Sequence, residues 1–164
     1  MPHAPPPVYD SGARLQPDAI VDAWIMGPRH WPEEMRLVTQ RGQAAVLSAP
    51  FYLNYIGYGS DWHAYYQIEP SNFTGGRAAE QGKLISGIKA CLWSEYIDAT
   101  NLIARAWPRA AAVAERAWSA ADVSDLEDAQ ARLAALRCEL IARGINAEPA
   151  NGPGFCQREW VPAY

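Results

Sequence analysis

The hydrophobic pattern of this chain alternates between short apolar runs and longer segments with helical spacing. Three apolar runs rich in branched side chains, at residues 19–25, 43–54 and 84–93, predict strands that are buried on both faces. A polar, acidic segment at 32–42 lies between the first two runs. It predicts a helix with a proline in its first turn and a glycine at its end.

The C-terminal half has the pattern of helices. Residues 107–118 predict one helix, with small residues along one side. Residues 124–144 predict the longest helix, because Ser124 and Glu127 have the spacing of a capping box and Gly144 fits a helix end. Four leucines on one stripe of this helix are expected to pack in the core: Leu126, Leu133, Leu136 and Leu140.

This order of elements favours an α/β fold with a parallel sheet. Three strands make an incomplete sheet, so the chain is expected to be part of a larger α/β architecture. A glycine-rich and aromatic connection, residues 55–82, separates the second and third predicted strands. A connection of this length is usually functional or mobile.

Aromatic and polar side chains follow the predicted strands where each one ends. Trp24 follows the first strand, Tyr52 and Asn54 end the second, and Trp93 and Glu95 end the third. In α/β folds the chemistry lies at the carboxyl ends of parallel strands. Aromatic faces pack against sugar rings, and amides or carboxylates accept hydrogen bonds from hydroxyl groups. The pattern therefore predicts a sugar pocket.

Composition and charge exclude several other classes of protein. The 164 residues carry a net charge of −4, which argues against binding of a nucleic-acid backbone. No apolar run reaches about 18 residues, so no membrane span is expected. Residues 1–17 are rich in proline, lack the pattern of a secretory signal, and are expected to form a flexible lead-in. Three histidines show no metal-ligand spacing, so no metal or cofactor is expected: His3, His30 and His63.

Longer stretches of the chain resemble the C-terminal part of the family 20 glycoside hydrolases, animal lysosomal β-N-acetylhexosaminidases in particular. They are LSAPFYLNYIGYGSDWHAYYQIEP, ACLWSEYIDATNLIARAWPRAAAVAERAWS and RCELIARGINAEP, within a resemblance over residues 18–158. The resemblance implies a (β/α)8 TIM barrel, of which residues 18–164 supply about three strand–helix units and the C-terminal helix. It also implies retaining removal of terminal N-acetylglucosamine or N-acetylgalactosamine, with the substrate's own 2-acetamide as nucleophile.

The resemblance assigns roles to several residues at the predicted strand ends. Tyr52 corresponds to a tyrosine whose hydroxyl binds the acetamide oxygen. Trp24 and Trp93 correspond to tryptophans that enclose the acetamide methyl and the sugar ring. Glu95 corresponds to a carboxylate that binds hydroxyls around the 4- and 6-positions, although a salt bridge to a basic residue, Arg105 or Lys89, is the alternative. Asn54 stands where many members have aspartate.

Two further positions are assigned less directly. Tyr55, expected to bind substrate, occupies a variable position where relatives that handle anionic substrates have arginine, so no preference for anionic substrates is expected. Tyr58 resembles a residue that reaches across a dimer interface. The partners implied are a second subunit, in a homo- or heterodimer, and N-acetylhexosamine-terminated glycans, glycolipids or chitooligosaccharides.

The family's Gly-Gly-Asp-Glu stretch, which carries the catalytic acid, does not occur in this sequence. We therefore expect this chain to be a partial one and to be inactive alone. The alternative is a non-catalytic sugar-binding or subunit-interaction protein that keeps the pocket wall without the acid.

Cysteines and a glycosylation motif bear on the compartment. Cys138 and Cys156 fall on positions paired as a disulfide in the animal enzymes, and Cys91 is expected to be a buried thiol. Asn72 begins an Asn-Phe-Thr sequon. Together these features predict a lysosomal or secreted glycoprotein, with its signal peptide upstream of this sequence.

Overall fold

The computed structural model describes residues 15–25, 27–55, 57, 59–75, 81–152 and 155–156. The chain divides into two compact units, and each has its own core. The first unit comprises Met1–Pro50 and Pro70–Lys89, and the second comprises Phe51–Glu69 and Ala90–Tyr164.

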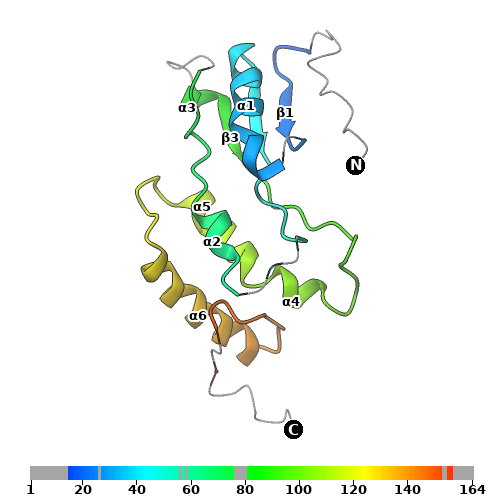
Figure 1. Cartoon of the computed structure of the whole chain (residues 1–164), viewed down its shortest axis with the longest axis vertical. Coiled ribbons are helices and arrows are strands. Elements are labelled where there is room, and N and C mark those ends of the chain that lie inside the picture. Colours follow the sequence, from blue (N-terminus) through cyan, green and yellow to red (C-terminus); the bar gives the residue numbers. More distant parts are fainter. Residues whose placement is uncertain are drawn as a thin grey trace. The chain divides into compact units, whose positions relative to one another are not determined.

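The first unit contains a three-stranded parallel sheet, as the sequence predicts (Figure 1). Its strands are β1 (Ile20–Ala23), β2 (Ala44–Leu47) and β3 (Ile85–Ile88), in the order β1-β2-β3. Each strand has four residues and is shorter than its predicted apolar run, because the chain leaves the sheet before the aromatic residues begin. The sheet therefore ends well before Trp93.

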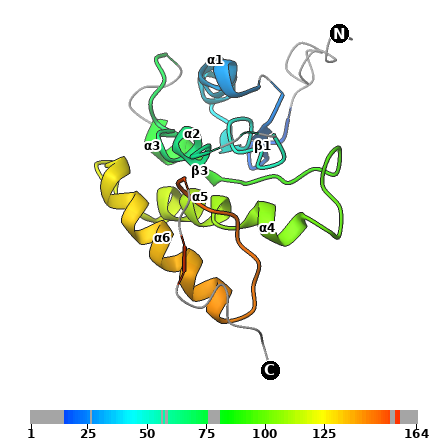
Figure 2. The same ribbon diagram turned by 60° about the horizontal axis from the view of Figure 1, so that its bottom comes forward.

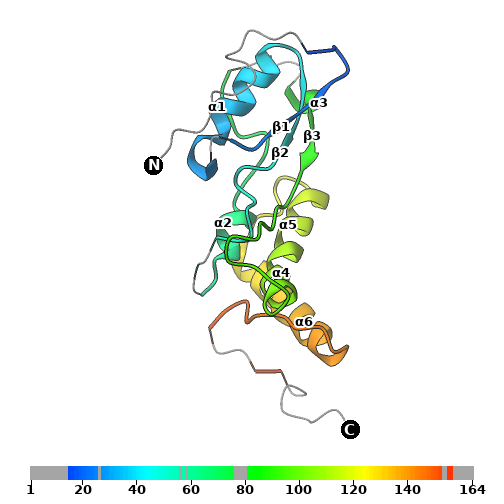
Figure 3. The same cartoon turned by 90° about the vertical axis from the view of Figure 1, so that its right-hand side faces the viewer.

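One face of this sheet is covered by α1 (Gly27–Gln40), as Figure 3 shows. Met35 and Val38 of α1 and Ala23 and Leu47 of the strands are fully buried. The helix begins five residues earlier than predicted, so Pro32 lies inside it and not in its first turn. Pro32 lacks the N–H that would bond to the carbonyl four residues earlier, so the first turns of α1 have one backbone hydrogen bond fewer.

Side chains that alternate with Ala23 and Leu47 point to the opposite face of the sheet. Ile20 of β1 is 61% exposed, so the expectation of strands buried on both faces is not met within this unit. Polar groups from all three strand ends meet here. The Asp22 carboxylate accepts a hydrogen bond from the Ser48 hydroxyl and pairs with the Lys89 ammonium. A short helix, α3 (Gln81–Leu84), leads into β3.

The second unit is built mainly of helices. They are α2 (Trp62–Tyr66), α4 (Leu102–Ala106), α5 (Arg109–Trp118) and α6 (Leu126–Ala142). Helix α5 contacts the other three, and Figure 2 shows α6, in yellow to orange, beside it. The sequence predicts α5 and α6 but not α2 or α4. Five residues are too few to show a helical period.

The start of α6 differs from the predicted capping box. Asp125, not Ser124, caps the helix, because its carboxylate accepts a hydrogen bond from the Asp128 N–H at 2.9 Å. Part of the leucine stripe is in the core: Leu133 and Leu140 are buried, whereas Leu126 and Leu136 are half-buried.

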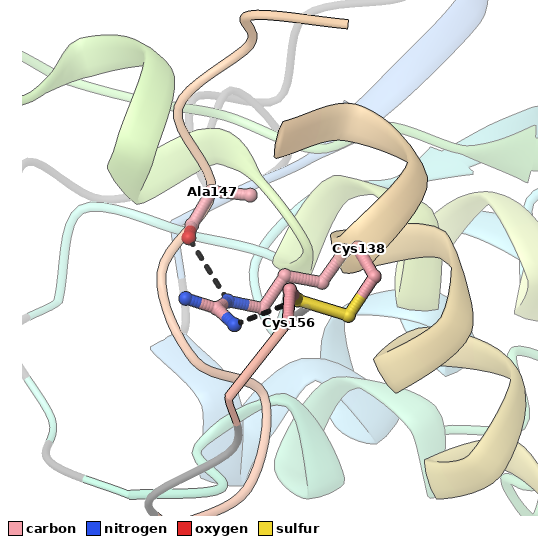
Figure 4. The surroundings of a disulfide bond; sticks show 4 residues. Cys138, Ala147 and Cys156 are labelled. Carbon is pink, nitrogen blue, oxygen red and sulfur yellow. Dashed lines mark hydrogen bonds between the residues drawn. A yellow bond between two sulfur atoms is a disulfide. The ribbon is translucent and has the colours of Figure 1, made fainter. Parts of the chain in front are cut away.

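A disulfide between Cys138 and Cys156 ties the tail to α6 (Figure 4), as the resemblance implies. Arg137 lies beside it in the core, where its Nε donates to the Ala147 carbonyl at 3.1 Å. The closed loop of 18 residues stabilises the fold by about 3 kcal/mol on a chain-entropy estimate. Cys91 takes no part in this bond and is half-buried, so the expectation of a fully buried thiol is wrong.

Within the described ranges, no helix combines the length and the apolar character needed to cross a membrane. The same ranges contain no group of three or more His, Cys, Asp or Glu side chains that could hold a metal ion.

Candidate functional site

Two segments that are distant in sequence meet in the second unit and form the candidate site. The Cys91 N–H donates to the Phe51 carbonyl at 2.9 Å, and the Leu53 N–H donates to the Cys91 carbonyl at 2.8 Å. These bonds form an isolated parallel bridge between Tyr52 and Cys91. The pairing stops there. The residues that follow on the two segments lie outside regular secondary structure and remain side by side.

The pairing brings Asn54, Trp93 and Glu95 together. The Asn54 side-chain amide donates to Glu95 Oε2 at 3.3 Å, and Asn54 Oδ1 accepts a hydrogen bond from the Trp93 N–H at 3.3 Å. The alternative partners of Glu95 are engaged differently. Arg105 pairs with Asp61. Lys89 pairs with the Asp22 carboxylate in the first unit.

Tyr52 and Tyr55 complete this group. Their rings lie 5.7 Å apart between centroids, at an interplanar angle of 55°. Tyr52 and Asn54 are buried, whereas Tyr55 and Trp93 are each 52% exposed and the Glu95 carboxylate is at the surface. The arrangement thus presents two half-exposed aromatic rings, an amide and a carboxylate. These are the groups that bind a sugar ring and its hydroxyls.

A buried arginine, Arg105, which the sequence indicates only as a possible partner of Glu95, holds the turn that carries Tyr52, Asn54 and Tyr55. Arg105 of α4 donates through Nε to the Leu53 carbonyl at 2.7 Å and through Nη2 to the Tyr55 carbonyl. Asp61 accepts from Arg105 at 3.0 Å and from Arg109 at 2.9 Å. Arg105 and Arg109 are almost fully buried, so such partners are needed to offset the cost of removing their charges from water. Two arginines four residues apart in an otherwise apolar segment were the available sequence signal.

The Tyr65 hydroxyl supports the same turn by donating to the Tyr52 carbonyl at 3.2 Å. Burial, and secondarily the charge of Asp61, raises the pKa of the Tyr65 phenol. The phenol therefore keeps its proton and remains a donor well into alkaline solution.

Arg105 and Arg109 also line a cleft of about 490 Å³, together with Tyr96, Asn101 and Glu148. None of the predicted sugar-binding residues is among the described residues that line this cleft. The candidate site is therefore distinct from this cleft.

Two predicted site residues lie in the first unit, and a third is outside the described residues. Trp24 follows β1 in the first unit and is 48% exposed, so its place in a pocket wall stays a prediction. Asn72 also lies in the first unit and is exposed. Tyr58, the predicted dimer contact, lies outside the described residues.

Comparison with known proteins places the chain in a family. Residues 7–121 match glycosyl hydrolase family 20, catalytic domain. The chain belongs to this family. It is 48% identical to the β-hexosaminidase subunit beta of Mus musculus over 152 residues, which cover 93% of the chain and 27% of that protein. It is 47% identical to the β-hexosaminidase subunit alpha of Bos taurus over 154 residues, or 93% of the chain and 28% of that protein.

A solved structure agrees with this assignment. The family 20 β-N-acetylhexosaminidase of Streptomyces coelicolor superposes with a TM-score of 0.63 at 26% identity, over 79% of this chain and 29% of that one. The chain thus spans between a quarter and a third of the length of the proteins it matches.

Proposed function

We propose that this chain is the C-terminal part of the catalytic domain of a retaining β-N-acetylhexosaminidase. Residues 18–164 then form the last three strand–helix units of a TIM barrel, after a lead-in of residues 1–17. The observation that carries the proposal is the group of Tyr52, Asn54, Trp93 and Glu95, in a chain of this family. The bridge between Tyr52 and Cys91 and the hydrogen bonds of Asn54 bring this group together.

The reaction proposed is substrate-assisted. The carbonyl oxygen of the 2-acetamide attacks the anomeric carbon, the glycosidic C–O bond breaks, and an acid outside this chain protonates the leaving oxygen. The Tyr52 hydroxyl donates to the acetamide oxygen, which orients that oxygen and stabilises the oxazolinium-like intermediate. Trp24 and Trp93 enclose the acetamide methyl and keep water away until the intermediate has formed.

The polar groups fix the far side of the sugar. Glu95 accepts hydrogen bonds from hydroxyls around the 4- and 6-positions, and Asn54 orients Glu95 by donating to its carboxylate. Tyr55 offers a neutral ring beside Tyr52, and such a ring favours an uncharged sugar surface.

The natural setting follows from the same proposal. The substrates are N-acetylhexosamine-terminated glycans, glycolipids or chitooligosaccharides, and the enzyme is a lysosomal or secreted homo- or heterodimer in which Tyr58 contacts the partner subunit. Two relatives of this chain are named as alpha and beta subunits, which supports an assembly of more than one subunit.

Tyr52→Phe in the full-length gene product tests the proposed chemistry. Loss of the donor should lower kcat on a chromogenic N-acetylglucosaminide by about 10²–10³. Tyr96→Phe is the matched control, because Tyr96 is 71% exposed and lies outside the proposed site; its kcat should be unchanged. An undiminished kcat in Tyr52→Phe would contradict the assigned role.

The alternative is a non-catalytic sugar-binding or subunit-interaction protein. It is favoured if the full-length gene product binds N-acetylglucosamine in calorimetry but releases no chromophore. Residues 1–164 expressed alone should be inactive, and turnover by that chain would contradict the proposed partial catalytic domain.

A further inference from the structure

The segment around Asn72 presents a complete glycosylation sequon at the surface of the first unit. Asn72 and Thr74 are both exposed, and the Phe73 ring between them is buried with 8% of its surface exposed. The three residues belong to neither a helix nor a strand. The side chains that a glycosyltransferase must reach therefore face solvent, while the intervening ring anchors the segment to the protein.

The position of this segment is set by close packing against α1. The Phe73 N–H donates to the Ser71 carbonyl at 2.9 Å. Gly75 has a φ of +94°, and a Cβ at this glycine would lie 2.7 Å from Arg36 Cδ. Glycine adopts this positive φ without strain, and its lack of a Cβ lets the backbone lie against the Arg36 side chain. The sequon is thus held on the helical side of the first unit.

This side is remote from the strand end that carries Trp24. The chain leaves β1 at Ala23 and enters α1 at Gly27, so the start of α1 lies near the carboxyl end of the sheet. At 1.5 Å per residue, Arg36 is about 14 Å further along the helix axis from Gly27. A glycan beside Arg36 would leave the carboxyl end of the sheet open.

A second feature, in the other unit, indicates the compartment in which such a modification occurs. The disulfide between Cys138 and Cys156 is the kind of bond that forms in the oxidising lumen of the secretory pathway. Asparagine-linked glycans are attached in that same lumen, to Asn-X-Ser/Thr on the surface.

We propose that Asn72 carries an N-linked glycan. In the transfer, the Asn72 side-chain nitrogen forms a bond to the anomeric carbon of the first sugar of a lipid-diphosphate-linked oligosaccharide. The bond between that carbon and the diphosphate oxygen breaks, the lipid diphosphate leaves, and the amide nitrogen loses one proton.

The direct test is peptide mass spectrometry of the full-length gene product, secreted from animal cells. The tryptic peptide of residues 42–77 contains no other sequon. After enzymatic release of N-glycans in heavy-oxygen water, Asn72 should appear as aspartate that carries one heavy oxygen atom. Recovery of this peptide with unmodified Asn72, without deglycosylation, would overturn the proposal.

Two variants at Thr74 provide a matched pair. Thr74→Ala should remove one glycan and increase electrophoretic mobility, whereas Thr74→Ser keeps the sequon and should migrate as the wild type. Because the sequon lies beside α1, both variants should retain wild-type activity on a chromogenic N-acetylglucosaminide. Equal mobility of the Ala and Ser variants would contradict a glycan at Asn72. This outcome is independent of the activity, so it leaves the proposed hydrolase function untouched.

Discussion

At the scale of single residues, the candidate site depends on Arg105 as much as on the side chains that are proposed to bind a sugar. Its guanidinium reaches two carbonyls of the turn, at Leu53 and Tyr55, and the carboxylate of Asp61. A planar group with five donors can serve three acceptors in fixed directions, whereas a lysine ammonium on a flexible stem cannot hold the same geometry. Arg105 therefore acts as a positioning residue for Tyr52 and Asn54.

We predict that Arg105→Lys in the full-length gene product lowers kcat/KM about tenfold to a hundredfold, because small misplacements of positioning groups have effects of this size. The loss should depend on Tyr52. In a Tyr52→Phe background the same substitution should change kcat/KM much less, since the group it positions is already absent.

A double-mutant cycle on a chromogenic N-acetylglucosaminide measures this coupling. Arg143→Lys is the control, because Arg143 is a highly exposed arginine at the C-cap of α6 that should tolerate the change. Equal losses from Arg105→Lys with and without the Tyr52 hydroxyl would show that Arg105 has only a general structural role.

At the scale of elements, the start of α6 offers a sharp comparison between two neighbouring residues. Ser124 has the sequence spacing of a cap, but Asp125 makes the hydrogen bond to the Asp128 N–H. The negative charge of Asp125 at the helix N-terminus adds to this effect. We predict that Asp125→Ala destabilises the first turn of α6 by about 1 kcal/mol. Ser124→Ala should change it by less than about 0.5 kcal/mol.

Hydrogen exchange of the α6 amides, in the full-length gene product, measures this difference. A loss of about 1 kcal/mol corresponds to about fivefold faster exchange in the first turn for Asp125→Ala. Faster exchange in Ser124→Ala, with Asp125→Ala unaffected, would assign the cap to Ser124.

The elements also show which parts of the structure the sequence could predict. The parallel sheet followed from three continuous apolar runs, and α5 and α6 followed from helical periods that are long enough to recognise. Asn54 and Glu95 were both predicted at strand ends as parts of one sugar pocket, and the structure joins them by a hydrogen bond. The contacts of Arg105 could not be predicted in this way. They depend on how far a long side chain reaches from a five-residue helix, and no local pattern encodes that reach.

At the scale of the whole molecule, the charged network of the second unit bears on how the protein withstands acid. Glu115 of α5 accepts hydrogen bonds from the Tyr66 hydroxyl of α2 at 2.6 Å and from Arg132 of α6. One partly buried carboxylate thus joins three helices. The hydrogen bond from Arg132, followed by that from Tyr66, lowers the pKa of Glu115. An enzyme proposed for the lysosome needs such pairs to stay ionised in mildly acidic solution.

The sign of the pH dependence follows from this lowered pKa. The folded protein holds the Glu115 carboxylate ionised at a pH where the unfolded chain has begun to protonate its own, near the unperturbed value of about 4.3. The stabilisation is therefore complete above that value and is lost as the pH falls through the lower pKa of the folded state.

We predict that Glu115→Gln lowers the melting temperature of the full-length gene product at neutral pH, through a loss of about 1–2 kcal/mol. The difference from wild type should persist at pH 5 and shrink as the pH falls below the ordinary carboxyl range. Glu139→Gln is the control: Glu139 is mostly exposed, its contact with Arg143 measures 3.9 Å, and a pair of this kind contributes little. The difference in melting temperature between Glu115→Gln and wild type could instead grow as the pH falls. That outcome would contradict the lowered pKa, because it requires a carboxyl group whose pKa is higher in the folded state than in the unfolded chain.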